Sequence, residues 1–249
     1  MPRYARTQSK SNVYHIMLRG INRTDIFLDE DDKNRFIDTI IRFKEKSKYE
    51  IYAYCLMDNH IHLLIKELEE PINVTMKRIG VSYAYYFNRK YKRIGHLFQD
   101  RYLSETIEDD AYILAAVRYI HNNPVKAKMV KSINDYKWSS YREYLSEAKL
   151  IKKDEILGMF AKDEERAVDL FKQYSKEEVE DAILDIDVGE ERDIVDEIIK
   201  KYGIEKDKVK EMSKSKRNEI LREIKTKSKV SVRDLSRILG IGKDIIFRA

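Results

Sequence analysis

The sequence predicts an α+β protein with two parts. The first is a ferredoxin-like or RRM-like antiparallel sheet with helices on one face, and the second is an all-α C-terminal region. Within residues 1–145, strand and helix patterns follow one another in the order βαββαβα. A single four-stranded antiparallel sheet accommodates this order. After residue 145 only helical patterns recur, which predicts the all-α region.

Each predicted element has a local signal. The Asp58-Asn59 pair separates two apolar runs and predicts the turn of a hairpin. Pro71 is placed as the first residue of a helix, and Pro124 stands just past the end of another. Apolar spacing supplies the remaining elements. The predicted strands are 14–19, 50–57, 60–66 and 103–107, and the predicted helices are 29–46, 71–91 and 109–122.

Charge divides the chain into regions. We expect a core domain at 1–145, an acidic helical connector at 146–190 and a basic helical region at 191–249. Residues 163–197 hold 4 Lys/Arg against 15 Asp/Glu, and residues 201–249 hold 15 against 7. Basic regions favour a polyanionic partner such as nucleic acid, and an ordinary solvated surface is the alternative.

Composition narrows the class of protein and its compartment. The chain has 249 residues, 43% of them hydrophobic, which is enough for one sizeable domain with a small appendage. Cys55 is the only cysteine, so no internal disulfide can form. No apolar run resembles a signal peptide or a membrane-spanning helix. We therefore expect a soluble, cytoplasmic protein without a membrane partner.

The triplet His60-Ile61-His62 is a candidate metal site. Side chains alternate across a strand, so both imidazoles project from one face while Ile61 points to the other. Two imidazoles this close could bind one metal ion. The alternative is a pair of hydrogen-bonded histidines on a sheet surface.

A second candidate element is the helical stretch around Tyr119. Tyr119 and Asn123 are four residues apart and share a helix face, so the Asn123 amide could complete a metal site beside the Tyr119 hydroxyl. That geometry suits a nucleophile that attacks a metal-bound phosphate. The alternative is a packing tyrosine followed by an ordinary helix stop. His121 points to another side of the helix, as a contact residue or a structural one.

Other residues carry weaker signals. His15 lies on the first predicted strand, as a core residue or as a partner of a metal ligand. Tyrosines and basic residues interleave within residues 83–93 and could stack on bases, although helix packing explains most of them. The candidates for phosphate contacts in the core domain, with solvent exposure as the alternative, are Arg3, Arg6, Arg19, Arg23 and Arg101.

Six stretches within residues 1–144 carry a resemblance to a known family. They are Pro2-Arg3 with Ala5-Arg6, YHIMLRGINRTDIF (14–27), YCLMDNHIHLLI (54–65), GHLFQDRY (95–102), RYIHNNPVKA (118–127) and WSSYREY (138–144). In this order they resemble the single-tyrosine HUH transposases and specifically their REP-associated branch. The last hundred or so residues depart from that branch as a C-terminal helical extension.

The resemblance implies an enzyme and assigns roles to its residues. His60 and His62 fall on the paired metal ligands of the family, Asn123 on the third protein ligand and Tyr119 on the nucleophile. The metal would be Mg²⁺ or Mn²⁺, and the substrate single-stranded DNA beside a hairpin. Attack by the tyrosine would give a 5′-phosphotyrosine and a free 3′-OH, which rejoining reverses without ATP.

The resemblance also bears on context. It places the protein at the nucleoid of a prokaryotic cell. Family members include monomers and homodimers, and the apolar pattern does not decide between them. A domesticated, non-catalytic DNA-binding regulator on the same fold is the alternative function. A replication initiator of the same fold is disfavoured, because the chain lacks a G-x-x-x-x-G-K-[ST] phosphate loop.

Residues 232–249 have the spacing of a helix-turn-helix. Leu235 and Leu239 would be core positions of the first helix, and Gly240 would form the turn. Lys243 and Arg248 would then face the major groove of duplex DNA. The alternative is an ordinary helical hairpin.

Overall fold

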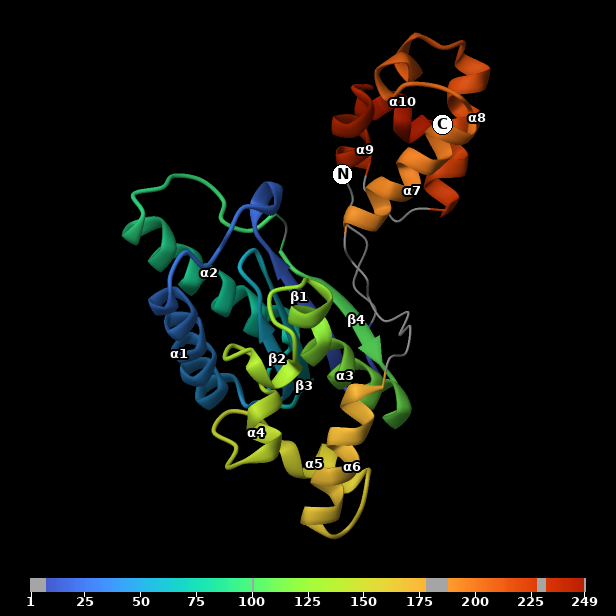
Figure 1. Ribbon diagram of the computed structural model, residues 1–249. Coiled ribbons are helices and arrows are strands. Elements are labelled where there is room, and N and C mark those ends of the chain that lie inside the picture. The colour runs from blue at the N-terminus through green and yellow to red at the C-terminus, as the bar shows by residue number, and fades with distance from the viewer. Residues whose placement is uncertain (1–7, 100, 178–187, 228–231, 249) are drawn as a thin grey trace. The chain divides into compact units, whose positions relative to one another are not determined.

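The computed structural model describes residues 8–99, 101–177, 188–227 and 232–248. The chain forms two compact units, Met1–Ile183 and Leu184–Ala249, each with its own core (Figure 1). Arg3 and Arg6 lie outside the described residues, and so do the side chains of Lys243 and Arg248.

The first unit is built on a four-stranded sheet in the order β2-β3-β1-β4, with every neighbouring pair antiparallel. This arrangement confirms the predicted α+β class. The Asp58-Asn59 turn joins β2 to β3, as predicted, and the central strand β1 pairs with both β3 and β4. The strands are β1 (Val13–Arg19), β2 (Tyr49–Leu56), β3 (His60–Glu67) and β4 (Leu103–Ile107).

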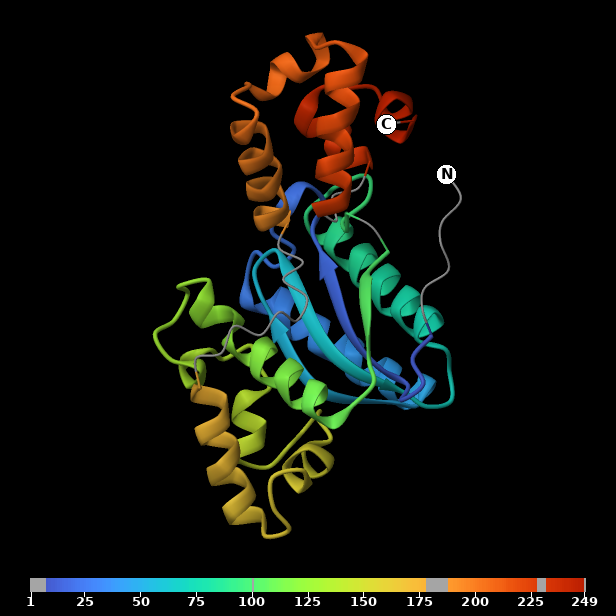
Figure 2. The ribbon, with the colours of Figure 1, turned by 90° about the vertical axis from the view of Figure 1, so that its right-hand side faces the viewer.

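Helices cover both faces of this sheet. Two helices, α1 (Glu30–Ser47) and α2 (Ile72–Lys90), pack together on one face, where the prediction placed them, and α3 (Asp110–Lys126) lies on the other (Figure 2). The prediction of helices on one face is therefore incomplete. The physical reason lies in β3, where Leu63 on one face and Leu64 on the other are both fully buried. A strand that is apolar on both faces requires cover on both.

Helix α3 continues past Pro124 to Lys126, although the prediction ended it at residue 122. Proline lacks an N–H, which removes one hydrogen bond from the ladder. The next turn is retained because the Ala127 amide donates to the Asn123 carbonyl at 2.9 Å. Lys126 consequently lies on the helix, two turns after Tyr119.

The first unit extends beyond the boundary predicted at residue 145. Phe171 of α6 is fully buried and stacks on Tyr144 of α4, with ring centroids 4.4 Å apart. Aromatic packing therefore joins α6 to the sheet domain, and residues 146–177 are not a detached connector. The elements after α3 are η2 (Ile133–Asp135), α4 (Tyr141–Leu145), α5 (Lys153–Gly158) and α6 (Glu164–Lys176).

The second unit is entirely helical over its described residues. Leu235, Leu239, Ile241 and Ile246 are buried in its core, and Gly240 has φ +63° between the last two helices. This conformation favours glycine. The turn and burial have the register that a helix-turn-helix requires, and DNA binding by it stays a prediction. The elements are α7 (Val188–Lys201), η3 (Lys206–Glu211), α8 (Lys214–Lys227), α9 (Val232–Leu239) and α10 (Lys243–Arg248).

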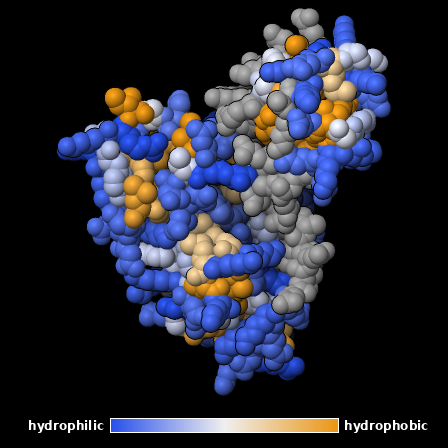
Figure 3. Space-filling model, turned by 45° about the horizontal axis from the view of Figure 1, so that its top comes forward, coloured by the Kyte–Doolittle hydropathy of each residue, from blue (hydrophilic) through white to orange (hydrophobic). Residues whose placement is uncertain are grey.

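The surface is rich in charged residues. On the face in Figure 3, hydrophilic residues predominate and apolar residues form separate small patches. Among the described helices, none combines the length and the apolar character needed to cross a membrane.

Candidate active site

His60 and His62 project from the same face of β3. Their ring centroids are 5.0 Å apart and the rings are nearly perpendicular, at 84°. His60 is half-buried at the end of the strand, whereas His62 is buried. Antiparallel pairing sets Arg19 opposite His60 and Met17 opposite His62 on β1. The sheet register thus holds both imidazoles at fixed positions. It also places Arg19 beside His60.

His15 forms a hydrogen bond with the His62 ring. The His15 Nε2 atom lies 3.0 Å from His62 Nδ1, and both residues are buried. Burial lowers the pKa of His15 to about 3. Burial, followed by the charges of His60 and His15, lowers the pKa of His62 well below its usual value. Both rings are therefore neutral near pH 7, which is the form of imidazole that binds metals.

Asn59 holds the His60 ring. Its Oδ1 lies 2.6 Å from His60 Nδ1, and its Nδ2 donates to the Arg23 carbonyl at 3.3 Å. An amide oxygen can only accept, so Nδ1 of His60 carries the proton and Nε2 carries the lone pair that a metal requires.

The loop after β1 supports this turn. The Gly20 amide donates to the Asn59 carbonyl at 2.9 Å, and the Ile26 amide donates to Asp58 at 2.8 Å. A Cβ atom at Gly20 would lie 2.0 Å from the Thr24 carbonyl oxygen, so only glycine fits there. The loop therefore fixes the backbone that carries Asn59.

Tyr119 lies on α3, the helix that covers the sheet face from which the histidines project. Its ring is edge-on to His62, with centroids 5.7 Å apart, and edge-on to His15 at 5.8 Å. The side chain is 5% exposed. The Nζ atom of Lys126 lies 4.9 Å from the centroid of the Tyr119 ring. The helix and the sheet thus bring together the phenol and the paired imidazoles, which are distant in sequence.

The donor set fits a divalent ion. Nδ1 of both imidazoles is engaged, so each would bind a metal through Nε2, and ligating histidines commonly have this arrangement. The Asn123 Nδ2 atom donates to the Tyr119 carbonyl at 2.9 Å, so Oδ1 is the Asn123 atom that could bind a metal. No group of three His, Cys, Asp or Glu side chains suited to a metal occurs in the described parts of the chain.

The other candidate residues are more dispersed. Arg19 and Arg23 are partly exposed near the histidine pair, and Arg101 is exposed. His121 is fully buried on a different side of α3 from Tyr119, and its Nε2 lies 2.8 Å from Ser140 Oγ. Rings of Tyr141, Tyr144 and Phe171 surround it. Its position is that of a core residue.

Sequence reasoning missed Asn59 and Lys126. Asn59 was used only as half of a turn pair, although its place directly before His60 was a signal. Lys126 was excluded from the helix because Pro124 was taken as its end. Its spacing of seven residues from Tyr119 would otherwise have placed both on one face.

Comparison with known proteins identifies the domain that carries this site. The family described as "Transposase IS200 like" matches residues 8–123, which contain His60, His62, Tyr119 and Asn123. The chain contains an IS200-like transposase domain. The predicted resemblance to the tyrosine transposases and the predicted enzyme class, a DNA transposase, are thereby confirmed.

Two known proteins are similar to this chain, one in sequence and one in fold. A Haemophilus influenzae protein named as a REP-associated tyrosine transposase is 28% identical over 153 residues, which cover 57% of this chain and 86% of that protein. A solved structure of a REP-associated tyrosine transposase bound to a REP hairpin is similar in fold, with a TM-score of 0.50 and 20% identity. That match covers 59% of this chain and 87% of the other.

Proposed function

We propose that this transposase nicks single-stranded DNA beside a hairpin through a 5′-phosphotyrosine at Tyr119, and later rejoins the strand. The observation that carries the proposal is the edge-on approach of Tyr119 to His62, at 5.7 Å between centroids. Packing alone does not require a polar hydroxyl on the ring that lies beside the neutral imidazoles of His15 and His62. The arrangement suits nucleophilic attack on a phosphate bound at the imidazoles.

His60 and His62 would hold Mg²⁺ or Mn²⁺ through Nε2, and Asn123 through Oδ1. Such an ion supplies Lewis-acid polarisation of the scissile phosphate and stabilises its growing charge. If His62 binds the metal through Nε2, its proton lies on Nδ1, which donates a hydrogen bond to His15 Nε2. The proton of His15 then resides on Nδ1, which has no hydrogen-bond partner within the described residues.

In the chemical step, the Tyr119 hydroxyl releases its proton to water, its oxygen forms a bond to phosphorus, and the bond from phosphorus to the 3′-oxygen breaks. The departing oxygen takes up a proton and becomes a 3′-OH. A free tyrosine side chain has a pKa of about 10, so the ionised nucleophile that attacks best needs support near pH 7. The Lys126 ammonium over the ring supplies a positive charge that favours this form. Since one phosphodiester replaces another, a different 3′-OH can displace the tyrosine and rejoin DNA.

A DNA hairpin is the proposed partner of the first unit. The solved REP-associated relative is bound to a REP hairpin, and this chain shares its fold. Arg19, Arg23 and Arg101 would contact phosphates near the cleaved bond, together with Arg3 and Arg6. Whether one chain or a homodimer completes the site is a further question for the same DNA complex.

Duplex DNA is the proposed partner of the second unit. The support is the α9–turn–α10 order, with Gly240 at the turn and a net basic charge over residues 201–249. Lys243 and Arg248 would face the major groove. A double Lys243→Glu/Arg248→Glu variant should lose duplex affinity in a gel-shift assay, while hairpin binding by the first unit persists. Equal duplex affinity of the variant and the wild type would contradict this role.

The test of the central proposal uses an oligonucleotide copied from inverted repeats beside the gene. Wild-type protein with Mn²⁺ should form a covalent adduct that survives denaturing electrophoresis, and Tyr119→Phe should form none. Tyr112→Phe is the matched control, since Tyr112 lies on the same helix, two turns before Tyr119, and bonds to Glu105 of β4. An adduct with Tyr119→Phe would contradict the proposal. Hairpin binding without any adduct in the wild type would favour the non-catalytic regulator.

A further inference from the structure

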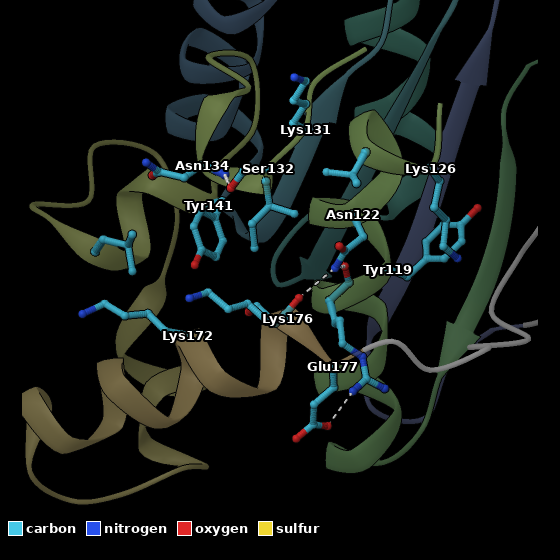
Figure 4. A pocket seen from close by; sticks show the side chains of 15 residues that line it. Tyr119, Asn122, Lys126, Lys131, Ser132, Asn134, Tyr141, Lys172, Lys176 and Glu177 are labelled. Atoms are coloured by element: carbon cyan, nitrogen blue, oxygen red, sulfur yellow. Dashed lines mark hydrogen bonds and ion pairs between the residues drawn. The ribbon is translucent and has the colours of Figure 1, made fainter. Parts of the chain in front are cut away.

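A basic recess lies against α3, beyond the histidine pair. It has a volume of about 920 Å³, within the size range of small-molecule pockets, about 300–1,000 Å³. Its walls come from α3, from residues 131–134, from α4 and from the C-terminal end of α6 (Figure 4). Helix α6 lies outside residues 8–123, which the transposase family matches. The recess is therefore partly built by the extension.

The charge of the recess favours an anion. Arg118, Lys126, Lys131, Lys172 and Lys176 line it, against the single acid Glu177. Within the part of the chain that the structure describes, the ammonium groups of Lys131 and Lys176 make no ion pair. Lys172 pairs with Asp169 at 3.0 Å, but both are substantially exposed, so that pair adds little. Several like charges in one recess repel each other unless an anion binds.

The inner wall of the recess is rigidly held. Arg118 is only 6% exposed; its guanidinium pairs with Glu177 at 3.2 Å and lies 4.1 Å from the centroid of the Tyr174 ring. The Asn122 amide donates to the Ser175 carbonyl at 3.0 Å and ties α6 to α3. The Ser175 hydroxyl is fully buried and has no hydrogen-bond partner among the described residues. A buried hydroxyl without a partner is a cost that a bound polar group could remove.

The recess borders the nucleophile. Tyr119 and Lys126 belong to its lining, and in Figure 4 the Tyr119 hydroxyl points away from Lys172 and Lys176. A strand whose scissile phosphate is held at the hydroxyl would have to pass the Tyr119 ring and Lys126 before its neighbouring phosphates reach the recess. A duplex has a rigid, paired form that enters a recess of this size poorly, whereas a single strand can bend into it.

We propose that this recess binds the phosphate backbone of the single strand next to the bond that Tyr119 cleaves. The inference rests on the proposed function. Its ligand chemistry is phosphodiester, recognised by lysine and arginine without reading the bases.

The test compares two double charge reversals that change the net charge equally. Lys131→Glu/Lys176→Glu alters opposite walls of the recess, and both lysines are exposed. Lys162→Glu/Arg166→Glu is the matched control, because both residues are exposed and neither lines the recess. Affinity for a labelled oligothymidylate and for a blunt dA·dT duplex is measured over a salt series. All proteins carry Tyr119→Phe and no metal is added, so binding is measured apart from cleavage.

The recess variant should bind oligothymidylate roughly 10-fold more weakly at low salt. The slope of log affinity against log salt should be shallower by about 1.4, since each phosphate contact on a single strand contributes about 0.7. Duplex affinity of the recess variant and oligothymidylate affinity of the control should match the parent. Equal losses in the two variants, or an equal loss on the duplex, would overturn the assignment. Failure of wild-type protein to form an adduct would contradict the proposed function. The binding measurements would still test the recess, because they are made without cleavage.

Discussion

The two faces of one β-sheet differ in what they bury. On the face covered by α1 and α2, β3 presents Ile61, Leu63 and Ile65, all fully buried. On the face covered by α3, the same strand presents His62, which packs with His15 and Tyr119. The period of two along a strand separates these sets cleanly. Along β3 one face is therefore wholly apolar, while the other combines the buried Leu64 with the polar groups of the site.

This difference has an energetic meaning. Burying an aliphatic side chain contributes about 1.5–3 kcal/mol, whereas a buried polar group is unfavourable unless it is hydrogen-bonded. His15 and His62 bond to each other, but Nδ1 of His15 has no partner among the described residues. Stability alone does not explain this pair, whereas the proposed role of His15 in orienting His62 as a metal ligand would explain it.

The largest expected contrast is between two neighbours on β3. His62→Ala should abolish adduct formation because one metal ligand is lost, with a modest change in stability. Leu63→Ala should lower the free energy of unfolding by about 2–5 kcal/mol, and the protein that remains folded should still form the adduct. Urea unfolding and adduct yield per folded molecule measure the two effects. If both variants lost the adduct equally per folded molecule, the division between the two faces would fail.

A smaller effect is expected from replacing His15, which forms a hydrogen bond with His62. His15→Phe removes the acceptor for His62 Nδ1 and should weaken Mn²⁺ binding by about 10–100-fold, the usual effect of losing such a partner. His121→Phe is the matched control, because burial also lowers the pKa of His121 to about 3 but its partner is Ser140. Titration of Mn²⁺ followed by electron paramagnetic resonance gives both affinities. Parallel losses would show that His15 acts only through stability.

The smallest effect is expected from replacing Asn59, which forms a hydrogen bond with the half-buried His60. Asn59→Ala frees the His60 ring and should weaken Mn²⁺ binding by about 10-fold, near the lower limit for a partner of this kind. Asn88→Ala serves for comparison, since the Asn88 amide bonds to the Gly95 carbonyl in a different loop. An unchanged Mn²⁺ affinity in Asn59→Ala would remove Asn59 from the account.

Local periodicity predicted most of the first unit. The four strands and the Asp58-Asn59 turn follow from alternation and turn chemistry, which act over a few residues. The cover on both faces of the sheet was missed, because it depends on how Leu63 and Leu64 meet different helices. Packing of Phe171 on Tyr144 is likewise a contact between distant residues, and charge gave no sign of it.

The site residues were likewise only partly predictable from the sequence. Spacing alone puts His60 and His62 on one strand face and Tyr119 and Asn123 on one helix face, and the resemblance to a family assigned roles to all four. Geometry between elements supplied the rest: His15 behind His62, and Lys126 over the Tyr119 ring. The basic recess was also invisible in sequence, since Lys131 and Lys176 meet only through the packing of α6 on α3.

The most direct test of the account is to map the DNA-linked residue. The chain has 17 tyrosines, so chance would rarely select the one beside the histidines. Wild-type protein is reacted with a hairpin oligonucleotide in Mn²⁺, then digested with protease and nuclease and sequenced by mass spectrometry. We predict a nucleotide on Tyr119 alone, and none when His62→Ala is used. A nucleotide on any other tyrosine, or on Tyr119 in His62→Ala at the wild-type yield, would contradict the account.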